Sequence, residues 1–93
     1  MLKVRALLEL YKIRKTPFIT GYRPIFDFNL ENRIDGQITL LDRKEFSPGD
    51  IAEVEILFIK EKFSESLIVG NNFTFAEAIQ PLGKGAILEI LRD

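Results

Sequence analysis

The side chains that could act as general acids or bases in this chain are carboxylates. The candidates are Asp27, Asp50, Glu53, Glu55 and Glu77. Their spacing indicates no acid and base working as a pair, and Asp50 fits a turn residue that caps its own backbone. The chain has no His and no Cys, so the commonest nucleophiles, general bases and transition-metal ligands are missing. Because Thr16 and Thr20 also lack a candidate base, we predict no catalytic residues, no metal site, no cofactor and no enzymatic activity.

Positive charge is concentrated in the first quarter of the chain. Residues 1–25 contain six basic side chains and one acid, a local charge of +5, whereas the remainder contains seven basic and thirteen acidic side chains, or −6, which closes at the net charge of −1. This asymmetry indicates an anionic partner, although the same charges are also typical of a solvated strand end. An RNA partner would place phosphates against the basic groups and a base against the tyrosine ring. The contacts would be Lys12, Arg14, Lys15, Tyr22 and Arg23.

The composition is that of a soluble globular protein. The 93 residues suit one domain spanning 1–93, with 46% hydrophobic and 29% charged residues and eight Phe for a small core. No apolar run approaches the length of a membrane span, and the first residues lack the apolar region of a signal peptide. We therefore expect a cytoplasmic protein without a membrane association.

Alternation of apolar and polar residues predicts a series of short strands. Residues 2–11 alternate with period two, and residues 26–31 form the clearest strand, with its Phe residues on one face. The dipeptide Asp-Gly predicts a turn over 32–36, followed by a returning strand over 37–41. These elements are typical of an antiparallel sheet.

The second half of the chain continues the pattern. Residues 42–50 form a loop that ends in a Ser-Pro-Gly-Asp turn, and residues 51–59 form the next strand. Residues 60–66 fit either a turn or a short helical piece. Residues 73–75 alternate again, and a last strand is predicted over 83–91. Five or six strands separated by Gly and Pro turns predict an antiparallel barrel or sandwich.

Two further features concern the surfaces of these strands. Leu57 and Ile59 end the outward face of strand 51–59 with apolar side chains, which indicates a possible apolar interface or cover by the 60–66 segment. Gly83 and Gly85 open the last strand and allow a sharp bend or a close backbone approach at a barrel corner.

One run of residues has a closely matching pattern elsewhere. Thr-Pro-Phe, two residues, Gly-Tyr-Arg-Pro, one residue and Phe are occupied without a gap by Thr16, Pro17, Phe18, Gly21, Tyr22, Arg23, Pro24 and Phe26. The run resembles the C-terminal β-barrel domain of bacterial elongation factor Tu. Later motifs of that domain are matched in the same order by Gly36, Ile38 and Leu40, by Pro48, Gly49 and Asp50, by Gly70 and Phe73, and by Gly83 and Gly85. The resemblance implies a closed six-stranded antiparallel Greek-key barrel.

The chain also departs from that family. It has no Gly-rich loop of the kind that cradles nucleotide phosphates, so we expect no GTP binding. The family's Arg-Glu-Gly-Gly-Arg run, which meets transfer RNA, is replaced by Ala76 to Gln80, in which Glu77 alone remains and is a further candidate contact for a partner or RNA. We predict a non-enzymatic interaction module that binds a protein partner, and the resemblance implies a partner from the translation machinery. The alternative is RNA binding through the basic N-terminal quarter, and self-association is a further option.

Overall fold

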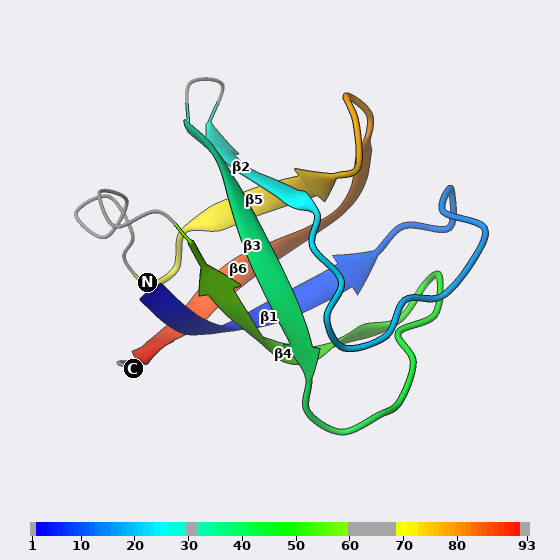
Figure 1. The fold of residues 1–93 in the computed structure, drawn as a ribbon, viewed down its shortest axis with the longest axis horizontal. Coiled ribbons are helices and arrows are strands. Elements are labelled where there is room, and N and C mark those ends of the chain that lie inside the picture. Colours follow the sequence, from blue (N-terminus) through cyan, green and yellow to red (C-terminus); the bar gives the residue numbers. More distant parts are fainter. Residues whose placement is uncertain (1, 30–31, 60–68, 92–93) are drawn as a thin grey trace.

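The computed structural model describes residues 2–29, 32–59 and 69–91, and within these ranges it contains six strands and no helix (Figure 1). The strands are β1 (Leu2–Leu10), β2 (Ile25–Asn29), β3 (Asn32–Leu40), β4 (Ile51–Phe58), β5 (Asn72–Ala76) and β6 (Pro81–Leu91). The all-β class predicted from the alternating sequence is confirmed.

The strands close into a barrel with the order β1-β4-β3-β2-β5-β6, and every neighbouring pair is antiparallel. Strands β2, β3 and β4 lie side by side in sequence order, and β1 lies against β4, which is a Greek-key arrangement. Closure leaves no free sheet edge. Because neighbours are antiparallel, the connections that leave β1, β3 and β5 meet at one end of the barrel. We call this end, formed by residues 11–24, 41–50 and 77–80, the loop end (Figure 1).

The core is filled by one face of each long strand and by phenylalanine rings. Val4, Ala6, Leu8 and Leu10 of β1 are fully buried, as period-two alternation predicted. The predicted inward face of β4, with Ala52, Val54, Ile56 and Phe58, is buried too. Phe26 lies at the centre, with ring centroids 5.2 Å from Phe58, 5.5 Å from Phe73 and 6.0 Å from Phe75. Edge and tilted ring contacts of this kind add stability beyond the buried area.

Two glycines on β6 make room for these rings. A Cβ at Gly83 would lie 2.3 Å from both the Glu9 carbonyl oxygen and the Phe75 ring. A Cβ at Gly85 would lie 2.4 Å from the Leu7 carbonyl oxygen and 2.6 Å from Phe73. The predicted close backbone approach is therefore confirmed, and it lets β6 lie against β1 with the two rings beneath it.

The predicted turn at residues 32–36 is wrong, because these residues belong to β3. Gly36 is inside the strand, where a Cβ would lie 2.8 Å from the Phe26 ring. Its lack of a side chain serves ring packing and not a chain reversal. The start of the last strand is also corrected, from residue 83 to Pro81. The open choice for residues 60–66 lies outside the described residues.

Candidate functional site

Aromatic rings and arginines gather at the loop end. The Phe18 ring stacks on Tyr22 with centroids 4.4 Å apart and on Phe46 at 5.2 Å. The guanidinium carbon of Arg14 lies 4.9 Å from the Tyr22 centroid, and that of Arg43 lies 5.5 Å from the Phe46 centroid. Both distances fall within the range of cation–π attraction. These five residues form what we call the loop-end cluster.

Backbone hydrogen bonds hold the rings of the loop-end cluster in place. Phe18 and Phe46 exchange two of them, with the Phe18 N–H donating to Phe46 at 3.0 Å and the Phe46 N–H donating to Phe18 at 2.8 Å. Gly21 has a φ angle of 103°, the left-handed region that glycine enters without strain. This turn lets Gly21 donate to the Ile38 carbonyl and lets Tyr22 accept from the Ile38 N–H, both at 2.9 Å. The resembling sequence run is thus tied to β3.

The charges of the loop-end cluster are paired within the molecule. The Arg14 side chain, only 15% exposed, donates to Glu77 at 3.1 Å and also to the carbonyl and hydroxyl oxygens of Thr16. Arg43 donates to Asp42 at 2.8 Å and to Asp50 at 3.1 Å. Both guanidinium groups are therefore already bound by carboxylates.

Three pKa values are shifted by these contacts. The hydrogen bond from Arg43 holds the pKa of Asp42 below its ordinary value, and the same bond raises the pKa of Arg43. Burial, and then the neighbouring Glu77 carboxylate, raises the pKa of the Tyr22 phenol. The Tyr22 hydroxyl is enclosed and makes no well-formed hydrogen bond to any described residue. Tyr22 therefore stays neutral and is not poised as a base.

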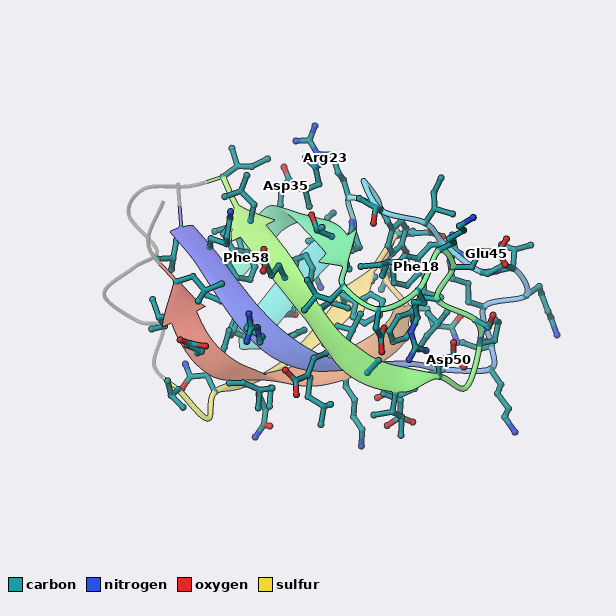
Figure 2. All side chains as sticks on the ribbon, turned by 90° about the horizontal axis from the view of Figure 1, so that it is seen from below. Phe18, Arg23, Asp35, Glu45, Asp50 and Phe58 are labelled. Atoms are coloured by element: carbon teal, nitrogen blue, oxygen red, sulfur yellow. The ribbon has the colours of Figure 1, made fainter. Side chains whose placement is uncertain are left out.

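The structure separates the predicted contact residues into two groups. It brings Arg14, Tyr22 and Glu77 together in and beside the loop-end cluster. Lys12, Lys15 and Arg23 are exposed, and none forms an ion pair with a residue in the described ranges. Figure 2 shows Arg23 pointing away from the barrel, whereas Phe18 and Asp50 lie at the loop end. Asp50 caps its turn as predicted, accepting from the Ser47 N–H at 2.8 Å.

The predicted apolar pair on β4 is only partly open. Leu57 is half-buried and lies in register between Lys3 of β1 and Gln37 of β3. Ile59 is 38% exposed, and its N–H donates to the Asp35 carbonyl at 3.3 Å. The predicted cover, residues 60–66, lies outside the described residues.

A more open apolar site lies on the outside of β4, β1 and β6, which we call the outer face. Leu7 of β1 and Ile51 of β4 are 41% and 58% exposed there. Together with Ala86 of β6 they form the apolar part of a hollow of about 290 Å³, whose lining also includes Glu9, Asn72 and Lys84. Sequence reasoning did not select these residues. The signal in the sequence was an apolar residue on a strand face that otherwise carries charged residues. The strand register that brings Leu7, Ile51 and Ala86 together is known only from the fold.

The chain matches no protein-family model. Among the residues that the structure describes, no group of three or more Asp or Glu side chains is arranged to hold a metal ion. The same residues include no helix with the length and apolar character needed to cross a membrane. The loop-end cluster and the outer face are the candidate sites in the part of the chain that the structure describes.

Proposed function

We propose that the chain is a non-enzymatic interaction module, related to the C-terminal barrel domain of elongation factor Tu, that binds a protein partner through its outer face. The observation that carries this proposal is the hollow lined by Leu7, Ile51 and Ala86. Apolar side chains that stand together on a sheet exterior are typical of protein-binding surfaces. Single exposed apolar residues scattered over the surface are normal and would not indicate a binding site.

The relation to elongation factor Tu is supported by the structural roles of the matching residues. Phe18 and Tyr22 stack at the loop end, Gly21 takes a positive φ angle, and Pro24 is fully buried. These roles all lie in the segment that connects β1 to β2 at the loop end. A partner from the translation machinery is the expectation that follows from this relation.

The same roles make the loop-end cluster a poorer binding site than its composition suggests. Arg14 and Arg43 are both bound by carboxylates, and one face of the Tyr22 ring is covered by Phe18. A phosphate would compete with Glu77 at Arg14 and with Asp42 and Asp50 at Arg43. This favours a role in folding for the cluster.

Capture of the tagged chain from a lysate of the cells that produce it tests the proposal. The face variant, Leu7→Ser with Ile51→Ser, is compared with a tip variant, Ile13→Ser with Ile79→Ser, in which two other exposed apolar residues are changed. We expect one stoichiometric protein with the wild type and the tip variant, and its loss with the face variant. A chain recovered without a partner, or a partner that the face variant retains, would contradict the proposal.

RNA binding is the second candidate, because Lys12, Lys15 and Arg23 remain exposed without ion pairs among the described residues. If these three side chains contact phosphates, affinity for transfer RNA should fall steeply as salt rises, with a slope of about −2 to −3 in log–log form. Fluorescence anisotropy at a series of salt concentrations measures this slope. Absence of binding even at low salt would exclude it.

A further inference from the structure

The hollow on the outer face is smaller than most small-molecule pockets and has room for an inserted side chain. Its volume of about 290 Å³ lies just below the roughly 300–1,000 Å³ of small-molecule pockets. Ala86 is paired with Leu7 across β1 and β6, and its small side chain leaves the space beside Leu7 open. Ile51 borders the same space from β4. An aliphatic side chain placed there would remove apolar surface of both Leu7 and Ile51 from water.

Carboxylates are in excess around the hollow. Arg5 is shared between Glu55, at 3.9 Å, and Glu89, at 3.8 Å, and Lys84 lies 4.0 Å from Glu9. Glu53 is a fourth acid on the same face. The side chains that surround the hollow in the strand register therefore carry a net charge of −2, from four acids and two bases. They are Glu9, Glu53, Glu55, Glu89, Arg5 and Lys84. The surface therefore attracts cations.

Glu53 is the free carboxylate of this group. It lies directly opposite Leu7 in the register of β1 and β4 and is exposed. It forms neither an ion pair nor a hydrogen bond with a side chain in residues 2–29, 32–59 or 69–91. Ile51 is its outward neighbour on the same strand. A chain that inserts a side chain beside Ile51 brings its next residues within reach of Glu53.

We propose that the partner inserts one aliphatic side chain between Leu7 and Ile51 and places a Lys or Arg beside it against Glu53. This assignment rests on the proposed function and adds the chemical class of the partner segment. A second copy of the chain offers Lys12 alone beside its exposed Ile13, because Arg14 is already held by Glu77. Self-association is therefore an outcome that the test has to separate from binding of another protein.

Three blocked pentapeptides serve as probes: Arg-Ser-Leu-Ser-Arg, Glu-Ser-Leu-Ser-Glu and Arg-Ser-Ser-Ser-Arg. Each is titrated into the isotope-labelled full chain, and amide shifts are followed by NMR. We expect the first peptide to bind about fivefold to tenfold more tightly than the second, because it gains attraction where the other meets repulsion. Replacing its leucine should weaken binding by a similar factor. The shifted amides should be those of Leu7, Ile51, Glu53 and Ala86.

A charge exchange provides the control. In the Glu53→Lys variant the preference should reverse toward the Glu-containing peptide, and in Glu53→Gln it should nearly vanish. Equal affinities in the wild type, shifts confined to the loop end, or no shifts at millimolar peptide would overturn the assignment. So would self-association of the chain that the face variant abolishes, since the occupant would then be a second copy. If capture yields a face-dependent partner but the peptides show no charge preference, the proposed function stands and this inference fails.

Discussion

The loop end and the outer face of this barrel both combine apolar with charged side chains but arrange them differently. At the loop end, Phe18 and Phe46 stack on each other, and each flanking arginine is bound by a carboxylate. On the outer face, Leu7 and Ile51 border a hollow and Glu53 has no partner among the described side chains. The ion-paired arginines and stacked rings of the first region hold its loops together, whereas the Glu53 carboxylate of the second region is available to another molecule. This contrast supports the proposal that the outer face is the binding surface.

The largest expected effect tests the folding role of the loop end. Phe46 is fully buried, so Phe46→Ala should lower the free energy of unfolding by about 3–5 kcal/mol through lost burial and a cavity. Urea unfolding measures the change. Ile79→Ala, at a loop tip with 83% of the side chain exposed, is the control and should leave stability nearly unchanged. A loss below about 1 kcal/mol for Phe46→Ala would mean that the stacked rings do not support the barrel.

The next effect concerns the barrel wall that lies under the outer face. In Gly85→Ala the new Cβ would lie 2.4 Å from the Leu7 carbonyl oxygen, a backbone atom that cannot rotate away. We expect a loss of about 1–3 kcal/mol from overpacking, again measured by urea unfolding. Lys84→Ala, an exposed change at the adjacent position, provides the comparison. Similar stabilities for the two variants would show that β1 and β6 tolerate a wider spacing.

Much of the barrel could be predicted because the alternation of apolar and polar residues along a strand indicates which of its faces is buried. Alternation in β1 and β4 identified their buried residues, and the Ser-Pro-Gly-Asp turn was recognised, with Gly49 at a φ of 92°. The turn at 32–36 failed because a glycine beside a ring and a glycine in a turn have the same sequence signature. Gly36 is required because a side chain would collide with the Phe26 ring, and not because the backbone takes a conformation that only glycine allows.

Neither candidate site could be derived in the same way, since both depend on residues distant in the chain. Arg14 and Glu77 are 63 positions apart, and neither local sequence indicates that the two side chains are in contact. Leu7 and Ile51 each appeared as an apolar residue on an outward face, but only the pairing of β1 with β4 places them beside one hollow. Register and closure are properties of the whole fold, and they decide which surface residues become neighbours.

A smaller effect should appear at alkaline pH. Folding raises the pKa of Tyr22, chiefly through burial, so its contribution to stability is complete below the unfolded value near 10 and declines as pH rises above it. The slope is at most about 1.4 kcal/mol per pH unit and is reduced by the partial exposure of the ring. Urea unfolding between about pH 9 and 11 measures it. Tyr22→Phe should remove this component, and Tyr11→Phe should keep it; equal slopes in all three proteins would contradict the assignment.

The smallest effect on stability is expected on the outer face, in contrast to the large effect expected at the loop end. Ile51 is 58% exposed, so Ile51→Ser removes little buried surface and should change the free energy of unfolding by no more than about 0.5 kcal/mol. Leu7→Ser should cost slightly more because Leu7 is less exposed, at 41%. Thermal and urea unfolding of both variants provide the measurement. A large loss at either position would mean that the hollow belongs to the folded core, and partner loss in the face variant would then report unfolding. Near-wild-type stability instead makes that loss a direct measure of binding.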